Sequence, residues 1–138
     1  MFIKQLSIFI ENRKGRLAEI TDIIAKHNIN IKALSIADTT NFGILRIIVD
    51  EPYPVEGLLS ENQITVSVTT VLGLAVPDKP GGIAAVLSLL SENDIAVEYM
   101  YGFMSKDETT AFIVLRVDDE FKAQDILKKN GYSGYIKQ

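Results

Sequence analysis

One short pattern occurs twice along this chain, and it constrains the fold more than any other feature of the sequence. The stretches ENRKGRLAEI (11–20) and PDKPGGIAAV (77–86) each hold a charged turn, a glycine and then apolar residues at helical spacing. When they are aligned on their glycines, GILRIIVD (43–50) later meets AFIVLRVD (111–118), after two extra residues in the second copy. Such self-similarity indicates one structural unit that the chain builds twice.

The first copy predicts a βαββαβ unit. Apolar and polar residues alternate in its opening stretch, which is typical of a strand, whereas Leu17, Ile20 and Ile24 lie on one stripe of a helix. In order, we expect a strand over 3–10, a helix over 16–27, a strand over 28–37, a turn over 38–43, a strand over 43–49, a short helix over 54–62 and a strand over 64–69.

The second copy predicts the same order of elements. Ile83, Val86, Leu87 and Leu90 have the i, i+3, i+4, i+7 spacing of the apolar face of a helix. We expect a strand over 71–76, a helix over 82–93, a strand over 95–104, a turn over 105–110, a strand over 111–117, a helix over 119–130 and a final strand over 132–136.

The sequence therefore predicts an α+β protein made of two ferredoxin-like units, 1–69 and 70–138, with antiparallel sheets and helices on one face. No linker separates the units, because ITVSVTTVLGLAV (64–76) is interrupted only by Gly73. Either one long strand serves both units, or the chain kinks near Thr69–Thr70. We expect the two units to pack against each other as a pseudo-symmetric pair, a pseudo-dimer.

The composition excludes several classes of protein. The net charge is −4 and neither half is basic, so we expect no nucleic-acid partner. No apolar run approaches the roughly 18 residues of a membrane span, and the first residues lack the features of a signal peptide, so we expect no membrane association. The chain contains no cysteine, which removes thiolate chemistry and fits a cytoplasmic protein.

Residues suited to catalysis are few. The single histidine, His27, stands late in the first predicted helix, where the helix dipole favours it as a solvent-facing residue. Asp118 and Asp119 stand at the start of the last predicted helix, and capping explains them more simply than acid–base chemistry. The motifs of phosphate loops, dinucleotide sites and serine nucleophiles do not occur. We therefore expect a protein that is not an enzyme and that holds no metal and no cofactor.

The repeated turn is suited to binding a carboxylate. A glycine lets the backbone turn tightly, and the first amides of a helix point outward with a partial positive charge. Such a helix start receives anions, and the side chain of Asn12, shortly before Gly15, offers both a donor and an acceptor. A small zwitterion fits this environment. The alternative is that Gly15 and Gly81 serve only the turn.

The whole chain resembles a tandem pair of ACT domains, the βαββαβ units that bind amino acids in regulated metabolic proteins. The resemblance rests on ENRKGRLAEITDIIAKHNINI (11–31) and on PDKPGGIAAVLSLLSENDIAV (77–97), in which the turn, the helix stripe and the next strand come in the family's order. It covers residues 1–138, and the arrangement is similar to small stand-alone double-ACT proteins.

The resemblance implies particular ligand contacts. In ACT domains that bind serine, two asparagines and a histidine contact the ligand, and the asparagines fall on Asn12 and Asn30 of this chain. The histidine position is Ile10, so one polar contact is missing and serine is disfavoured. In the second copy, Asp78 and Ala96 stand where the asparagines would be.

The resemblance also implies two unlike pockets, because in such families the ligand lies between two units and touches the turn of one and the second strand of the other. The first turn would face Tyr99, Met100 and Tyr101, and the second turn would face Asn30 and residues 33–36. The candidate ligand-binding residues are Asn12, Lys14, Gly15, Arg16, Leu17, Asn30, Asp78, Pro80, Gly81, Gly82, Ile83, Tyr99, Met100 and Tyr101.

Most of these residues also have a purely structural explanation. Asp78 would cap the second helix, and Asn30 would cap the turn before a strand. Tyr99 and Tyr101 would simply cover the sheet or an interface. The charged side chains of Lys14, Arg16, Arg46 and Arg116 would be solvated.

The leading hypothesis is an allosteric regulatory module that binds a free amino acid and forms a homodimer through its edge strands. One alternative is an interaction protein, such as the small regulatory subunit of a biosynthetic enzyme, similar to that of acetolactate synthase. Another is an acylphosphatase-like hydrolase, which needs an arginine and an asparagine placed for phosphate that we do not find.

Overall fold

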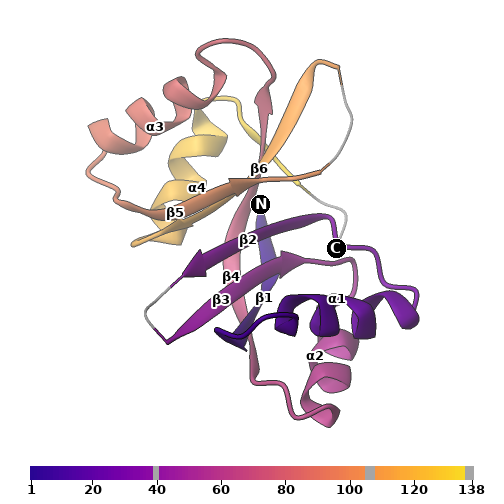
Figure 1. Ribbon diagram of the computed structural model, residues 1–138. Helices are drawn as coiled ribbons and strands as arrows, with labels where there is room; N and C mark the ends of the chain where they lie inside the picture. Colours follow the sequence, from indigo (N-terminus) through magenta and orange to yellow (C-terminus); the bar gives the residue numbers. More distant parts are fainter. Residues whose placement is uncertain (39–40, 105–107, 136–138) are drawn as a thin grey trace. The chain divides into compact units, whose positions relative to one another are not determined.

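The computed structural model describes residues 1–38, 41–104 and 108–135 (Figure 1). Parts of the predicted turns 38–43 and 105–110, and the end of the predicted strand 132–136, lie outside these residues. The elements of the described residues are β1 (Phe2–Glu11), α1 (Arg16–Lys26), β2 (Ala33–Asp38), β3 (Phe42–Ile48), α2 (Pro52–Glu61), β4 (Val66–Pro77), α3 (Gly82–Glu92), β5 (Val97–Gly102), β6 (Thr110–Val117), α4 (Glu120–Lys129) and β7 (Ser133–Gly134).

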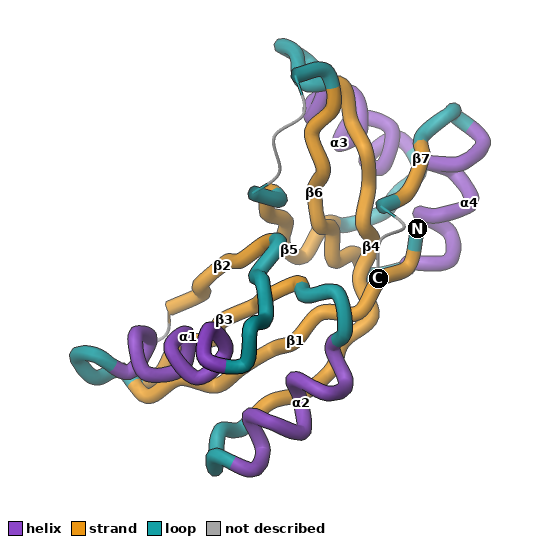
Figure 2. Tube along the Cα trace, turned by 90° about the vertical axis from the view of Figure 1, so that its right-hand side faces the viewer, coloured by secondary structure: helices purple, strands orange, loops and turns teal. Residues whose placement is uncertain are grey.

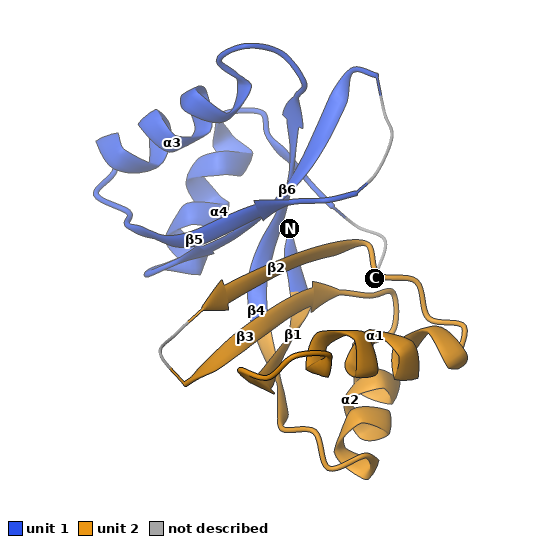
Figure 3. Cartoon of the chain, viewed as in Figure 1, with its two compact units in different colours: residues 1–3, 70–137 blue, residues 4–69, 138 orange. Residues whose placement is uncertain are grey.

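The chain divides into two compact units (Figure 3). Residues 4–69 form one, which we call the N-terminal unit. The other, the C-terminal unit, consists of residues 1–3 together with the described chain from Thr70 to Tyr135. Since both boundaries fall inside strands, β1 and β4 each contribute residues to both units.

The N-terminal unit is an antiparallel sheet with the strand order β2-β3-β1-β4. Ile8 of β1 lies opposite Leu45 of β3, and Leu34 of β2 lies opposite Ile47. Figures 1 and 2 both show α1 alongside β1 and β3. The core that joins the helices to the sheet consists of Leu6, Ile8, Ile10, Ile20, Ile24, Leu45, Ile47, Val49, Val55, Leu59 and Ile64.

The C-terminal unit repeats this plan with β4, α3, β5, β6, α4 and β7. Its strand order is β5-β6-β4, and the short β7 pairs with β4. Residues at the start of the chain extend the pairing, because the amide of Gly73 donates to the carbonyl oxygen of Met1 at 2.8 Å. Its core consists of Leu72, Leu74, Val76, Val86, Leu90, Ile95, Ile113, Leu115, Val117, Ala123 and Leu127.

Both predicted units therefore have the ferredoxin-like βαββαβ order and antiparallel pairing that the repeat indicates. The choice between one long strand and a kink is settled in favour of the strand, since β4 runs for 12 residues without a break. Its alternation explains this continuity. Val66 and Val68 pack against the core of the N-terminal unit, and the same period then places Leu72, Leu74 and Val76 in the core of the C-terminal unit.

The predicted start of the second strand at residue 28 is wrong, because β2 begins at Ala33. Asn28 follows α1 with a left-handed φ of 57°, and the amide of Ile29 still donates to the carbonyl oxygen of Ile24 at 3.3 Å. The chain first reaches β3 when the amide of Lys32 donates to Ile48 at 2.8 Å. Residues 28–32 therefore end the helix and connect it to the sheet.

Two further predictions concern helix starts. The predicted start of the short helix at residue 54 is wrong, since α2 begins at Pro52, where the fixed φ of proline suits the first helical position. The predicted capping at the last helix is confirmed for Asp119, whose carboxylate accepts a hydrogen bond from the amide of Lys122 at 3.0 Å.

The two glycines of PGG in the second copy have different roles. Gly81 has a φ of 87°, a left-handed conformation that glycine adopts without strain. Gly82 is buried at the first position of α3, and a Cβ there would overlap the carbonyl oxygen of Pro77. This close approach of backbone to backbone leaves no room for any side chain.

We expect Gly82→Ala to lower the free energy of unfolding by more than about 1 kcal/mol, because the helix start must move away from Pro77. Gly57→Ala is the control, since a Cβ at this exposed position of α2 meets nothing within 4 Å. That replacement should raise stability by roughly 0.5–1 kcal/mol through helix propensity. Urea denaturation measures both, and equal stability of the two variants would contradict the close approach.

Candidate ligand-binding site

The strand-to-helix turns of the two units have the same backbone structure. Gly15 and Gly81 precede α1 and α3 with φ values of 86° and 87°. The matching hydrogen bonds run from the amides of Arg16 and Gly82 to Arg13 and Lys79 (3.3 and 3.0 Å), and from the amides of Glu19 and Ala85 to Gly15 and Gly81 (both 3.0 Å). The predicted repeat therefore extends to individual backbone bonds.

Each turn leaves two amides at the helix start without an acceptor within the described part of the chain: those of Leu17 and Ala18 in α1, and those of Ile83 and Ala84 in α3. Neither helix start has a side-chain cap there. The prediction that Asp78 caps α3 is wrong, because Gly81 holds the capping position. These amides carry the partial positive charge of a helix N-terminus.

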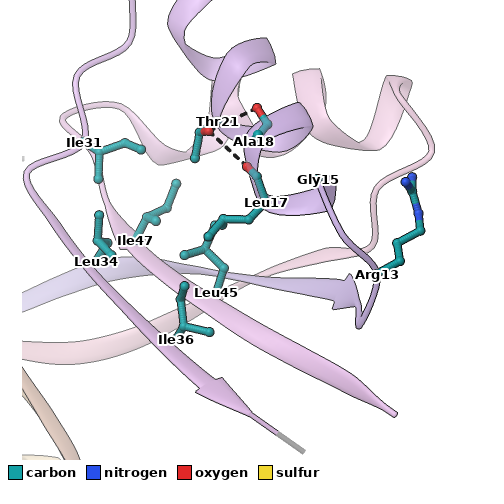
Figure 4. Close-up of a pocket in the computed structure, with 10 residues that line it drawn as sticks. All are labelled: Arg13, Gly15, Leu17, Ala18, Thr21, Ile31, Leu34, Ile36, Leu45 and Ile47. Carbon is teal, nitrogen blue, oxygen red and sulfur yellow. Dashed lines mark hydrogen bonds between the residues drawn. The ribbon is translucent and has the colours of Figure 1, made fainter.

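A cavity of about 470 Å³ lies beside the first of these turns (Figure 4). It is open on one side and lined mainly by aliphatic side chains from α1, β2 and β3. Figure 4 shows Leu17 directed toward Leu45 and Ile36. The lining residues are Arg13, Gly15, Leu17, Ala18, Thr21, Ile31, Leu34, Ile36, Leu45 and Ile47.

The cavity exists because α1 does not cover β2. Leu34 and Ile36 lie opposite Ile47 and Leu45 in the sheet register, so their side chains are on the face that carries the core. Leu45 and Ile47 are buried, yet Leu34 is 40% exposed and Ile36 47% exposed. The sheet therefore presents an aliphatic surface that none of the described helices covers.

Thr21 adds little polarity to this wall. Its hydroxyl donates to the carbonyl oxygens of Leu17 and Ala18, at 3.0 and 3.2 Å, within its own helix. The proton of this hydroxyl is therefore engaged within the helix and is not available as a donor to a ligand.

Four charged side chains surround the first turn. Arg13 contacts Glu19 through two hydrogen bonds of 3.0 and 3.2 Å. Arg16 contacts Glu11 at 2.7 Å and Glu19 at 3.1 Å. The prediction that the side chain of Arg16 is solvated is wrong, since only 15% of it is exposed.

These contacts change the titration of the acids. Hydrogen bonds from Arg13 and then Arg16 lower the pKa of Glu19. A hydrogen bond from its own backbone amide lowers the pKa of Glu11, with a further contribution from Arg16. Both carboxylates are therefore held in their charged form close to the helix start.

The structure places the candidate residues of the first turn unequally. Gly15 and Leu17 line the cavity, whereas Asn12 and Lys14 are exposed in the turn and do not. Asn30 lies beyond the opposite end of α1, where it lines a separate cavity of about 430 Å³ with Asn28, Ile29, Asp50, Glu51, Pro54 and Val55.

The candidates of the second copy lie in the C-terminal unit. Asp78, Pro80 and Gly81 are exposed in the turn before α3, whereas Gly82 is buried at the first position of α3 and Ile83 is exposed at the second. The amide of Asp78 donates to the carbonyl oxygen of Thr109 at 3.0 Å, which ties the turn to the segment before β6.

On β5, the rings of Tyr99 and Tyr101 stack with their centroids 6.5 Å apart, while Met100 packs against the core of the unit.

The prediction of a solvated Arg116 is wrong. Its guanidinium donates to the carbonyl oxygen of Thr70 at 2.7 Å and lies 3.5 Å from the carboxylates of both Glu98 and Glu120.

The prediction that His27 is a solvent-facing residue at the helix end is confirmed, since it is exposed directly after α1 with Nδ1 2.9 Å from the carbonyl oxygen of Ile23.

Among the residues that the structure describes, no group of three or more His, Asp or Glu side chains is arranged for a metal ion. Within the same residues, every helix is too short or too polar to cross a membrane.

Sequence reasoning missed Thr21 and Ile31 as lining residues, and it assigned Leu34 and Ile36, within residues 33–36, to a pocket at the second turn and not to this cavity. A signal was present in NINIKALSIA (28–37), where apolar residues change from one face of the predicted strand to the other between Ala33 and Leu34. Such a change leaves apolar side chains on both faces, and one of these faces borders the cavity.

We expect Glu19→Gln to destabilise the protein near neutral pH and to have no effect in acid. A carboxyl whose pKa is lowered by folding stabilises the folded state above its unfolded pKa, and this stability is lost as the pH falls through the folded pKa. Thermal denaturation of both proteins between pH 2 and pH 7 measures this. A difference that persists at the acid end would contradict the ion-pair explanation, and Asp22→Asn provides a control on the same helix.

Comparison with known proteins gives consistent matches. The family model of the ACT domain pair matches residues 1–137. The crystal structure of protein BT0572 from Bacteroides thetaiotaomicron is 41% identical with a TM-score of 0.90, over 98% of this chain and 92% of that one. The ligand-free regulatory subunit of aspartate kinase from Thermus thermophilus shares the fold, with 11% identity and a TM-score of 0.65 over 93% of this chain and 92% of that one. No curated protein matches. This chain therefore belongs to the ACT-domain family, as an ACT domain pair.

Proposed function

We propose that this protein is a regulatory module that binds a free amino acid at the start of α1. The observation that carries the proposal is the position of the aliphatic cavity directly beside two amides that have no acceptor among the described residues. The cavity suits a side chain, and the amides suit a carboxylate. Membership of the ACT-domain family supports a regulatory, ligand-binding role.

The α-carboxylate of the ligand would accept hydrogen bonds from the amides of Leu17 and Ala18. These donors are fixed by the first turn of the helix, so that little ordering is needed when the anion arrives. The guanidinium of Arg13, which lines the same cavity, adds positive charge. Because Arg13 already contacts Glu19, the ligand would have to share or displace that contact.

The α-ammonium needs an acceptor at the rim of the cavity. Asn12 is exposed in the same turn, and its side-chain oxygen is a suitable acceptor. The turn of the C-terminal unit, from Asp78 to Ile83, has the same backbone hydrogen bonds. Asn30 belongs to the other cavity of the N-terminal unit and would contribute separately.

Binding would regulate by favouring one arrangement of the protein over another, because a ligand shifts an equilibrium by its differential affinity for the two states. The change would be read by another copy of the chain in a homodimer, or by a partner enzyme of amino-acid metabolism. The regulatory subunit of aspartate kinase, which has this fold, favours the second possibility. The absence of cysteine agrees with a cytoplasmic location.

A thermal-shift screen with the twenty standard amino acids tests the proposal. A ligand present at 100 times its dissociation constant adds about 2.7 kcal/mol to the stability of the folded state. One or a few amino acids should raise the melting temperature of the intact chain. If none of the twenty changes it, the proposed function is wrong, and co-purification with a larger enzyme becomes the observation to pursue.

We expect Ala18→Pro to weaken binding by roughly 10- to 100-fold, since proline removes one amide donor to a charged group. Proline is tolerated in the first turn of a helix, and the amide of Ala18 has no acceptor to lose within the described chain. Isothermal titration calorimetry measures the dissociation constant. Ala18→Gly keeps the amide and serves as the control, so equal binding by the two variants would refute this contact.

A further inference from the structure

We propose that the ligand carries a large hydrophobic side chain and that only the N-terminal unit binds it, with one molecule per chain. This inference rests on the proposed function and deepens it by naming the class of amino acid and the number of sites. It is carried by the lining of the cavity and by the residues that stand at the matching positions of the C-terminal unit.

The sheet side of the lining offers no side-chain partner for a polar group. From the sheet it consists of Leu34, Ile36, Leu45 and Ile47, which are all aliphatic. The hydroxyl of Thr21 is bonded to its own helix, and Arg13 is paired with Glu19 at the rim. A polar or charged side chain that packs against the sheet would lose its hydration there without gaining a hydrogen bond from these residues.

The size of the cavity favours a large side chain. Its volume of about 470 Å³ lies within the range of sites for small ligands. Alanine or serine would leave most of the aliphatic wall in contact with water, whereas leucine, isoleucine or phenylalanine would cover it. Since affinity rises with the apolar area removed from water, we expect affinity to increase with the size of the hydrophobic side chain.

The internal repeat allows the same positions to be inspected in the C-terminal unit. Met100 lies opposite Leu115 and Gly102 lies opposite Ile113, as Leu34 and Ile36 lie opposite Ile47 and Leu45 in the N-terminal unit. The matching positions are therefore Leu34 with Met100 and Ile36 with Gly102, and aligning the two helix-start glycines pairs the same residues.

These matching positions differ in whether they present an exposed aliphatic side chain, which is what forms the wall of the cavity. Leu34 is exposed to the cavity, but Met100 packs against the core of its own unit. Ile36 projects an aliphatic side chain, whereas Gly102 has none. On the helix, the larger Leu87 of α3 occupies the position that matches Thr21 of α1. The C-terminal unit thus has the turn and the amides without the strand-side wall for a hydrophobic side chain.

Titration calorimetry of the intact protein tests both the class of amino acid and the number of sites. The amino acids to compare are leucine, isoleucine, phenylalanine, alanine, serine, aspartate and lysine. We expect one hydrophobic amino acid per chain, bound at least 10-fold more tightly than alanine. Preferred binding of serine, aspartate or lysine, or two equivalent molecules per chain, would overturn the inference while leaving the proposed function intact. If no amino acid binds, the proposed function fails and this inference falls with it.

A matched pair of variants locates the site. Ile36→Asp puts a charge into the exposed wall and should weaken binding of the preferred amino acid at least 10-fold. Gly102→Asp is the control at the matching position, where a Cβ meets nothing within 4 Å, and it should change affinity by less than about 2-fold. Unchanged binding by Ile36→Asp, or equal losses in both variants, would overturn the assignment to the N-terminal unit.

A third variant covers the possibility that Ile36→Asp does not fold, which circular dichroism would show. Thr21→Leu narrows the cavity from the helix side, and leucine is accepted at the matching position of α3 as Leu87. We expect this variant to fold and to bind phenylalanine at least 5-fold more weakly than the unaltered protein. Binding at full strength would contradict the position of the side chain between α1 and β2.

Discussion

The N-terminal unit depends on the hydrophobic packing of α1 and α2 against one face of its sheet. Ile20 and Ile24 of α1, together with Val55 and Leu59 of α2, meet the strands in a single core. The apolar area that these contacts remove from water is the main source of stability. The same packing stops short of β2, and the candidate site is the part of the sheet that the helices leave uncovered.

The fold was predictable from the sequence because the repeat, the strand alternation and the helix stripes all agree. The element boundaries that were predicted wrongly depend on interactions between segments. The path from Asn28 to Lys32 is set by a left-handed residue and by the hydrogen bond to Ile48, neither of which alternation reveals. The role of Gly82 depends likewise on where the backbone of Pro77 returns, and that of Arg116 on the position of Thr70.

The candidate site was predictable only in part. The turn is a local structure, so Gly15 and Leu17 were found from the helix-start pattern. The opposite wall comes from β2, and its contribution depends on the register with β3 and on the reach of α1. Sequence periodicity assigns Ile36 to a strand. It becomes a candidate ligand contact only when the structure shows that no described helix covers its side chain.

The boundaries of the two units fall inside β1 and β4, and this has a consequence for how the protein is made. Residues 1–3 are synthesised well before Gly73, whose amide donates to the carbonyl oxygen of Met1. Domains generally fold in the order of their synthesis. Here residues 1–3 belong to the unit that is synthesised later, so they take their place beside Gly73 only after β4 has been made.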